Sequence, residues 1–417
     1  MDSIQIHGGV ALQGKVCIQG SKNAALPILA ATLLTEDTSY IRNCPKIADV
    51  YGMIELLRSL GCAVSWEESG IRVNTGQICY GQMPAQAVTS MRSSLCLLGA
   101  LLGRWGEILM EYPGGCVIGE RPIDLHLSAL SKMGVEFQDE DGKIHGIARK
   151  LHGATICLPF ISVGVTENIL LAAVMAQGET LIEGAAREPE VVALCEFLQR
   201  CGARMEGVGT RRIKVFGGYA LHGADYPVPA DRIVAGTYLF ATIATGGNVF
   251  LEKAPYRQME TVLLTAGRMG AQCTASEEGI YVQAREHPLL LTDLRTMPYP
   301  GFPTDLQSVA LASNTVGEGS CLIEETIFEN RFRVVEPLRR MGAHIDILDA
   351  GHVRVNGTEG LHGDKVEARE LRGGAALVVA GLMAEGKTTV KECHFIHRGY
   401  ENICKDFREL GARIVSV

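Results

Sequence analysis

The chain has 417 residues, of which 47% are hydrophobic and 21% are charged, and its formal net charge at pH 7 is -8. This length exceeds one compact core and predicts two domains of ordinary soluble composition. The acidic balance, without a long run of one sign, excludes a nucleic-acid binder, which needs a basic face. Arginines that converge locally can still bind an anionic ligand.

The cysteines and the start of the chain indicate a reducing compartment. There are 13 cysteines, an odd number, and Met1, Asp2 and Ser3 lack the basic and apolar regions of a signal peptide. We therefore expect a cytoplasmic protein with reduced thiols. No Cys-x-x-Cys pair occurs, so no zinc site is predicted, and apolar stretches such as 169–176 are too short to span a bilayer.

One signature recurs six times along the chain. The end of an amphipathic helix is followed by an apolar residue, a glycine, a small residue and a short alternating strand. The glycines are 68 to 73 residues apart, at Gly61, Gly134, Gly202, Gly270, Gly342 and Gly411. Glycine suits the left-handed conformation that ends a helix, and alternation is typical of a half-buried strand. Six α/β units of about 70 residues predict three units in each of two domains.

The order of these units predicts how the domains are connected. The first strand, around residues 4–18, precedes the first full unit, and the chain ends on a strand. We expect the first strand to pair in the C-terminal domain, so that the chain crosses between domains near 20–22 and near 228–232. The predicted domains are residues 22–229, and residues 1–21 together with 230–417. Helices such as 168–176 and 375–384 are apolar nearly all round and should be core helices.

The segment 113–126 carries the strongest chemical signal. Cys116 lies on a glycine-rich loop, and Arg121 follows five residues later. A fixed positive charge nearby favours the reactive thiolate, although a buried structural cysteine on a turn is the usual alternative. His126 is assigned no role, because a histidine on a helix face is more often a satisfied core residue.

Three further sites lie at the predicted starts of helices. Lys22 precedes the helical run 26–34, Arg92 precedes the apolar helix 95–102, and small residues at 162–164 precede another helix. A helix start beside a basic residue is a ready anion site, and small residues there let backbone amides approach a diphosphate. A solvated surface residue or a plain helix cap is the alternative at each site.

Asp305 opens a predicted helix after two prolines. A carboxylate in such a rigid loop can act as a general base, and Thr304 or Asp305 can equally be an N-cap. Six basic residues lie near strand-to-helix turns, at Lys22, Arg92, Arg121, Arg331, Arg372 and Arg398. Each alone is equally a surface residue in a salt bridge. Together they would form a positive cleft for a substrate with several negative charges.

Over essentially its whole length, the sequence resembles the UDP-N-acetylglucosamine 1-carboxyvinyltransferase family of enolpyruvyl transferases. The matching motifs are Gly-Ser-Lys-Asn-Ala-Ala at 20–25, Met-Arg-Ser-Ser at 91–94, the cysteine loop at 113–126, Asp-Arg at 231–232, Phe-Pro-Thr-Asp at 302–305, Phe-Glu-Asn-Arg-Phe at 328–332, Leu-Arg at 371–372 and Arg-Gly-Tyr-Glu at 398–401. The cysteine loop is the most specific of them.

The resemblance implies a fold and a reaction. The fold is two inside-out α/β barrel domains, each of three repeats, joined by a double-crossing hinge and facing each other across a cleft. The reaction transfers the enolpyruvyl group of phosphoenolpyruvate to the 3'-hydroxyl of UDP-N-acetylglucosamine and releases phosphate, the first committed step of peptidoglycan synthesis. It proceeds by addition and elimination through a tetrahedral ketal, and it uses no metal or organic cofactor.

The resemblance also implies a role for each donor-binding residue. Lys22, Arg121 and Arg398 would hold the phosphate of phosphoenolpyruvate. Arg331 and Arg372 would bind its carboxylate and hold the closed state.

The resemblance implies four catalytic residues. Lys22 and Arg398 are two of the donor ligands just named, and Cys116 and Asp305 are the other two. Cys116 would act as a general acid near the methylene or form a covalent adduct, and fosfomycin-type epoxides would alkylate it. Asp305 would take the proton of the sugar hydroxyl. The UDP-sugar site would be lined by Asn23, Arg92, Pro122, Ile123, Asp124, Leu125, Ser162, Val163, Gly164 and Ile327.

The sequence departs from the family pattern at a few positions that leave the catalytic set whole. Phe160 stands where some relatives carry a lysine near uracil, Cys96 where some carry a tryptophan, and His397 where an aspartate usually precedes Arg398. Two other hypotheses about the function stay open. One is the sister transferase acting on shikimate 3-phosphate, which does not use a loop cysteine. The other is a silent copy that binds UDP-sugar and regulates a partner.

Overall fold

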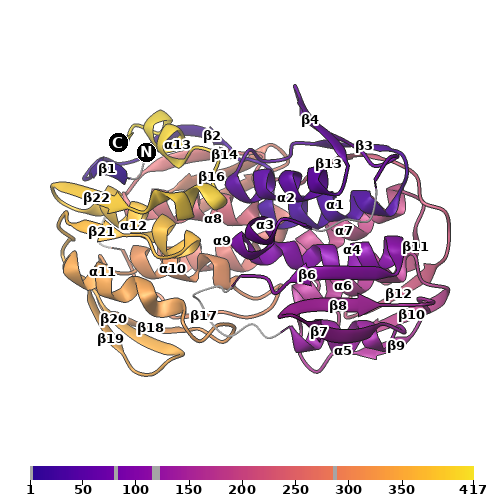
Figure 1. Cartoon of the computed structure of the whole chain (residues 1–417). Coiled ribbons are helices and arrows are strands. Elements are labelled where there is room, and N and C mark those ends of the chain that lie inside the picture. The colour runs from indigo at the N-terminus through magenta and orange to yellow at the C-terminus, as the bar shows by residue number, and fades with distance from the viewer. Residues whose placement is uncertain (1–2, 79–82, 115–122, 285–288) are drawn as a thin grey trace. The chain divides into compact units, whose positions relative to one another are not determined.

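The computed structural model describes residues 3–78, 83–114, 123–284 and 289–417 (Figure 1). The chain forms two compact units. Unit 1 contains residues 3–19 and 230–417, and unit 2 contains the described residues of 20–114 and 123–229. The chain passes from unit 1 to unit 2 after Gln19 and returns after Pro229.

Three sheets and three buried helices make up unit 2. The sheets have the strand orders β13-β3-β5-β4, β11-β12-β10-β9 and, among the described residues, β6-β8-β7. Their strands are β3 (Thr38–Arg42), β4 (Ala63–Glu67), β5 (Gly70–Asn74), β6 (Glu107–Glu111), β7 (Glu136–Glu140), β8 (Lys143–Ile147), β9 (Thr155–Cys157), β10 (Gly178–Glu183), β11 (Arg204–Glu206), β12 (Arg212–Gly217) and β13 (Asp225–Pro227). The helices are α1 (Lys22–Ala31), η1 (Thr32–Leu34), α2 (Ala48–Ser59), α3 (Ala85–Ser90), η2 (Arg92–Leu95), α4 (Cys96–Trp105), α5 (Asp124–Ser131), α6 (Val163–Ala173) and α7 (Pro189–Arg200), of which α1, α4 and α6 are the buried ones.

Unit 1 repeats this plan. Its sheets have the strand orders β21-β22-β1-β23, β15-β16-β14-β2 and β17-β18-β20-β19. Their strands are β1 (Ser3–His7), β2 (Gln13–Cys17), β14 (Asn248–Glu252), β15 (Gln272–Ser276), β16 (Gly279–Gln283), β17 (Leu294–Arg295), β18 (Ser320–Glu324), β19 (His344–Ile347), β20 (His352–Asn356), β21 (Lys365–Glu367), β22 (Lys387–Lys391) and β23 (Arg413–Ser416). The helices are α8 (Arg232–Ala244), η3 (Tyr256–Gln258), α9 (Glu260–Arg268), α10 (Thr304–Ser313), η4 (Arg331–Val334), α11 (Val335–Arg340), α12 (Leu371–Met383), η5 (Cys393–Arg398) and α13 (Ile403–Glu409).

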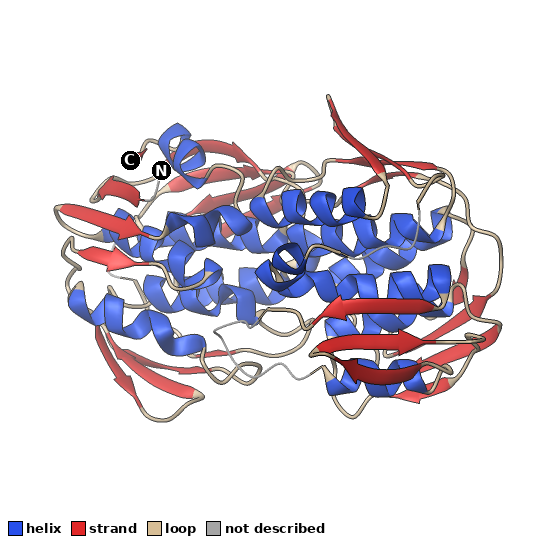
Figure 2. Ribbon diagram, viewed as in Figure 1, coloured by secondary structure: helices blue, strands red, loops and turns tan. Residues whose placement is uncertain are grey.

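Within each unit the apolar helices lie inside and the sheets lie outside (Figure 2). In α8 every residue from Ile233 to Ala244 is buried, and in α12 every residue from Leu371 to Leu382. Helix α10 packs against both of them. The prediction of two α/β domains with three repeats each and all-apolar core helices is therefore confirmed. The three sheets of each unit stay separate in their hydrogen bonding, so the described strands close no barrel.

The repeated glycine stops are confirmed as well. All six adopt a positive φ, between 90° at Gly61 and 102° at Gly202. A side chain is strained in that conformation, so each helix ends where the sequence places its glycine.

The N-terminal segment forms two strands where one was expected. Strand β1 pairs antiparallel with β22 and β23, and β2 pairs parallel with β14 in a different sheet. Gly8 and Gly9 separate the two strands, and Gly9 has a φ of 78°. The alternation of apolar and polar residues therefore runs across both strands, although the turn at Gly8 and Gly9 ends the hydrogen bonding of β1 before β2 begins.

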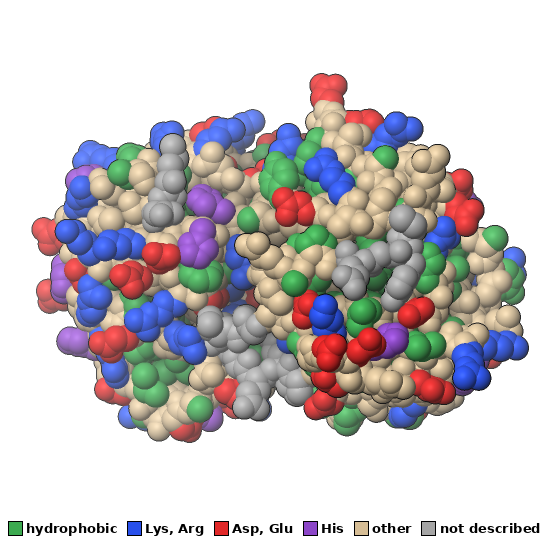
Figure 3. Space-filling view, viewed as in Figure 1, with side chains coloured by type: hydrophobic (Ala, Val, Ile, Leu, Met, Phe, Trp, Pro, Cys, Tyr) green, Lys and Arg blue, Asp and Glu red, His purple; other side chains and the backbone are tan. Residues whose placement is uncertain are grey.

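The outer surface of unit 2 carries a group of acidic side chains. Acidic side chains gather over the sheet β6-β8-β7 (Figure 3). Lys143 and His145 of β8 lie 3.1 Å from Glu111 and 3.2 Å from Glu107. No described helix has the length and apolar composition needed to cross a membrane.

Candidate active site

Asp305 lies between two buried arginines of unit 1. It is the second residue of α10, Arg331 begins η4, and Arg372 is the second residue of α12. Asp305 Oδ1 accepts from Arg331 Nη2 at 2.8 Å, and Asp305 Oδ2 accepts from Arg372 Nη2 at 2.7 Å. The arginine side chains are only 1% and 5% exposed. The structure thus brings together three predicted residues that are 26 and 67 positions apart.

Asp305 does not cap its own helix. The N-cap position of α10 is Pro303, and no side chain in the described part of the protein caps the helix there. Thr304 donates its hydroxyl to Glu325 Oε2 at 2.9 Å instead. The alternative that Thr304 or Asp305 serves as an N-cap is therefore wrong. The Asp305 carboxylate instead accepts charge-assisted hydrogen bonds from the two arginines, which are stronger than bonds from neutral amides.

Glu370 lies beside both arginines and was missed by sequence reasoning. It is the N-cap of α12 and accepts from the backbone N–H groups of Arg372, at 2.7 Å, and Gly373. Its Oε2 lies 3.9 Å from Arg331 Nη1. Arg331 also donates to the carbonyl oxygen of Thr304, from Nη2 at 3.1 Å. An acidic residue directly before an apolar helix was the available signal.

The surroundings of Arg372 keep its guanidinium protonated. Burial alone lowers the pKa of its guanidinium, but the negative charge of Asp305, followed by Tyr400 and Asp231, outweighs burial and raises that pKa. The Tyr400 hydroxyl is itself buried and lies 2.8 Å from the Thr237 hydroxyl. Arg372 is therefore a permanent buried cation.

The remaining unit 1 candidates lie at related element ends. Arg398 ends η5, which packs against α12, and Ile327 follows β18, where its backbone N–H donates to Glu325 Oε1 at 2.8 Å. Asp231 is the N-cap of α8 and accepts from Ile233 N at 2.8 Å. Asp231 is thus a helix-capping residue.

In unit 2, Lys22 and Asn23 are the first two residues of α1. Lys22 Nζ lies 2.7 Å from Asp49 Oδ2, and their side chains are 12% and 5% exposed. Asp49 is on α2 and was not among the predicted residues. A cation at a helix start faces the positive end of the helix dipole, and the buried Asp49 carboxylate offsets this repulsion.

His126 connects Arg92 with the start of α6. The Asn168 side-chain amide donates to His126 Nδ1 at 3.0 Å, and a Cβ built on Gly164 would lie 3.3 Å from His126 Cε1. Burial, and then the charge of Arg92, lower the pKa of His126 to about 4. The ring is therefore neutral at pH 7, with Nδ1 as an acceptor and Nε2 as a donor.

The other acceptor-site candidates flank this histidine. Ser162 is the N-cap of α6 and accepts from Val165 N at 3.5 Å, while Val163 and Gly164 form the first turn. Ile123 is buried before α5, and Asp124 and Leu125 begin that helix. Cys116, Arg121 and Pro122 lie outside the described residues.

Comparison with known proteins covers the entire chain. The profile of the EPSP synthase (3-phosphoshikimate 1-carboxyvinyltransferase) family matches residues 6–407. A UDP-N-acetylglucosamine 1-carboxyvinyltransferase of Desulfovibrio desulfuricans is 45% identical over 415 residues, with 99% of each chain covered. One from Nitratidesulfovibrio vulgaris (strain Hildenborough) is 45% identical over 414 residues, again with 99% of each chain covered. The chain belongs to the UDP-N-acetylglucosamine 1-carboxyvinyltransferase family.

Solved structures agree with this family fold. The enolpyruvyl transferase NikO of Streptomyces tendae matches with a TM-score of 0.89 and 24% identity, covering 99% of this chain and 98% of its own. EPSP synthase of Acinetobacter baumannii matches with a TM-score of 0.77 and 20% identity over the full length of both chains. At such identities the likeness concerns the fold alone.

The positions that depart from the family pattern have defined surroundings. Phe160 is 62% exposed. Cys96 is buried, with Sγ 3.7 Å from Glu167 Oε2, and burial followed by the Glu167 charge raises the pKa of its thiol. A histidine side chain cannot carry the negative charge of an aspartate, and burial lowers the pKa of His397, which favours its neutral form.

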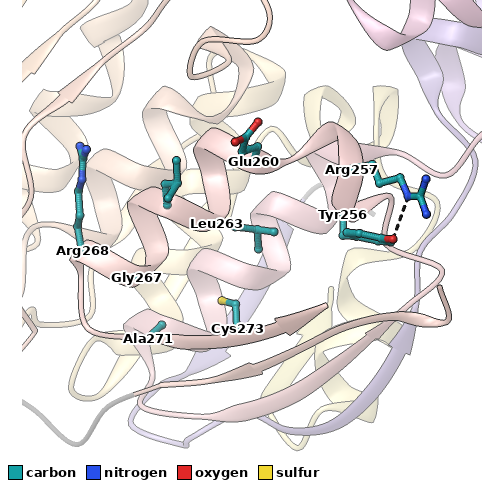
Figure 4. Close-up of a pocket in the computed structure, with 9 residues that line it drawn as sticks. Tyr256, Arg257, Glu260, Leu263, Gly267, Arg268, Ala271 and Cys273 are labelled. Carbon is teal, nitrogen blue, oxygen red and sulfur yellow. Dashed lines mark hydrogen bonds between the residues drawn. The ribbon is translucent and has the colours of Figure 1, made fainter. Parts of the chain in front are cut away.

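A surface groove of unit 1 is separate from these residues. It measures 780 Å³ and is lined by α9 and β15 residues such as Leu263, Gly267 and Cys273 (Figure 4). Arg257, at one end of the groove, donates to the Tyr256 hydroxyl at 2.9 Å. None of the described site residues lines this groove, so it is not the candidate active site.

Proposed function

We propose that this chain is a cytoplasmic enzyme that transfers the enolpyruvyl group of phosphoenolpyruvate to the 3'-hydroxyl of UDP-N-acetylglucosamine and releases phosphate. This is the first committed step of peptidoglycan synthesis. The observation that carries the proposal is the cluster of Asp305 with the buried Arg331 and Arg372, in a chain 45% identical over its length to proteins named for this activity.

The donor is bound by basic residues. Arg331 and Arg372 take its carboxylate, because planar guanidiniums match carboxylate geometry. Lys22, Arg121 and Arg398 take its phosphate. Lys22 is supported in this role by its place at the start of α1, where backbone amides add to the attraction for an anion.

The acceptor is bound mainly by residues of 22–229. The first turn of α6 offers amides to the diphosphate, and Arg92 adds positive charge beside it. The proposed acceptor site comprises Asn23, Arg92, Pro122, Ile123, Asp124, Leu125, Ser162, Val163, Gly164 and Ile327. Residues 1–21 with 230–417 supply Asp305 and the carboxylate-binding arginines, so both domains contribute to turnover.

The chemistry is an addition followed by an elimination. Asp305 accepts the proton of the 3'-hydroxyl while that oxygen bonds to C2 of the donor, and an acid protonates the C3 methylene. Loss of phosphate from C2 and of a proton from C3 then restores the double bond. Cys116 serves as the acid or as a covalent partner, and a fosfomycin-type epoxide would alkylate it.

The test is phosphate release from phosphoenolpyruvate with UDP-N-acetylglucosamine as acceptor. We expect release that depends on this acceptor and is blocked by fosfomycin, and Asp305→Ala should lower kcat about 10³-fold or more while UDP-sugar binding persists. Release with shikimate 3-phosphate alone would assign the sister activity. UDP-sugar binding without any release would indicate the silent copy. Unchanged release by Cys116→Ser would remove the thiol from the mechanism.

A further inference from the structure

We propose that Asp305 occupies the place on Arg331 and Arg372 that the carboxylate of phosphoenolpyruvate takes during turnover, so that donor binding itself releases the catalytic base. This inference rests on the proposed function, which assigns the three residues their separate roles. It adds that the base and the donor carboxylate are alternative occupants of one pair of guanidiniums.

The geometry of the cluster is that of a bound carboxylate. One oxygen of Asp305 bonds to each arginine, at 2.8 Å and 2.7 Å, so a single carboxylate bridges both cations. Both arginine side chains are almost fully buried. Buried cations need counter-charge, and here Asp305 supplies it to both arginines.

The Nη1 atoms of the two guanidiniums have looser contacts than the Nη2 atoms. Nη1 of Arg372 is buried and has no hydrogen-bond partner among the described residues. Nη1 of Arg331 has its carboxylate neighbour, Glu370 Oε2, at 3.9 Å, which is longer than a hydrogen bond. A buried donor gains from an acceptor, so Nη1 of Arg372 is a donor that a carboxylate can use. A carboxylate that first binds through Nη1 could then take over Nη2.

The two acidic neighbours of the arginines differ in how firmly they are held. Glu370 is fixed by the backbone amides of Arg372 and Gly373, so it stays in place as the arginines change partners. Asp305 is held through its side chain by the Nη2 atoms of the two arginines. At 27% exposure it is the more accessible of the two acidic side chains, since Glu370 is 12% exposed.

The test measures binding of phosphoenolpyruvate without any acceptor, by titration calorimetry. Asp305→Asn keeps the shape of the side chain but removes the competing charge. Its matched control is Asp364→Asn, which makes the same change in an exposed ion pair of unit 1, 2.6 Å from Arg340. We expect Kd to fall at least about tenfold in Asp305→Asn, equivalent to about 1.4 kcal/mol, and to stay unchanged in Asp364→Asn. Unchanged, weaker or undetectable binding by Asp305→Asn would overturn the exchange.

A crystal structure of the unsubstituted protein with phosphoenolpyruvate provides a second measurement that does not depend on the folding of a variant. Asp305 should have left both Nη2 atoms, with the donor carboxylate in its place. Asp305 still bonded to both arginines beside bound donor would overturn the proposal. The two proposals can fail separately. If Asp305→Asn binds phosphoenolpyruvate more tightly but the unsubstituted protein releases no phosphate with the acceptor, the transfer reaction is refuted and the exchange is supported.

Discussion

Acidification from pH 6.5 to pH 4 should destabilise unit 2 through His126. Burial, aided by the charge of Arg92, lowers the pKa of His126 to about 4, whereas a histidine in the unfolded chain titrates near 6.5. Between these values the unfolded chain takes up a proton that the folded protein refuses. The free energy of unfolding therefore falls as the pH falls through this window, and it levels off below about pH 4.

The size of the effect follows from the same two values. The gap between 6.5 and about 4 corresponds to about 3 kcal/mol once both states are protonated. At pH 5.5 the expected loss is about 1.4 kcal/mol, because the unfolded histidine is then mostly protonated and the folded one is not. Losses of this size are a sizeable fraction of the stability of a typical domain.

The assay is urea unfolding followed by tryptophan fluorescence. The chain has two tryptophans, Trp66 and Trp105, and both belong to unit 2, so the signal reports the unit that contains His126. His126→Asn places an amide oxygen where Nδ1 accepts from Asn168, and His222→Asn, at an exposed position, is the matched control. Should the stability difference between the unsubstituted protein and His126→Asn stay constant from pH 7 to pH 4.5, this reasoning is refuted.

Two further predictions concern the helices beside this histidine. Burial, and then the charge of Glu190, raises the pKa of Glu167 well above its usual value. The folded protein therefore retains a proton that the unfolded chain releases above about pH 4.5, and the free energy of unfolding falls as the pH rises. Glu167→Gln should accordingly raise Tm, by more at pH 8 than at pH 5, and an equal gain at both would contradict this. Gly99→Ala should cost about 1–3 kcal/mol, because its Cβ would lie 2.3 Å from the Asn168 carbonyl oxygen. Calorimetry can compare it with Gly267→Ala, which meets nothing within 4 Å and should be neutral or stabilising.

The repeat architecture could be predicted because its determinants are local. A helix that stops at Gly202 needs a positive φ there, and a helix that is apolar all round, such as α12, can only lie inside. Both properties can be read from a few adjacent residues. The double strand at the N-terminus could not be predicted in this way, because it depends on which distant strands β1 and β2 pair with.

The candidate residues were predicted more completely than their partners. Motifs singled out Lys22 and Asp305, but nothing near them in the sequence indicated that Lys22 pairs with Asp49 or that Asp305 bridges two arginines. These pairs arise where the starts of different helices meet. They follow from the packing of repeats and not from the pattern within any one of them.

The pairing of β1 with β23 has a consequence for synthesis on the ribosome. Ile4 and Ile6 of β1 face partners at 388–390 and 414–416, and Val417 N donates to the Ser3 carbonyl oxygen at 2.9 Å. In unit 2 the first and last segments are joined to each other, because Ser21 N donates to the Pro229 carbonyl oxygen at 2.8 Å. During translation unit 2 can thus complete its core early, while the emerged β1 strand must wait, with its apolar side chains uncovered, until nearly the entire polypeptide has left the exit tunnel.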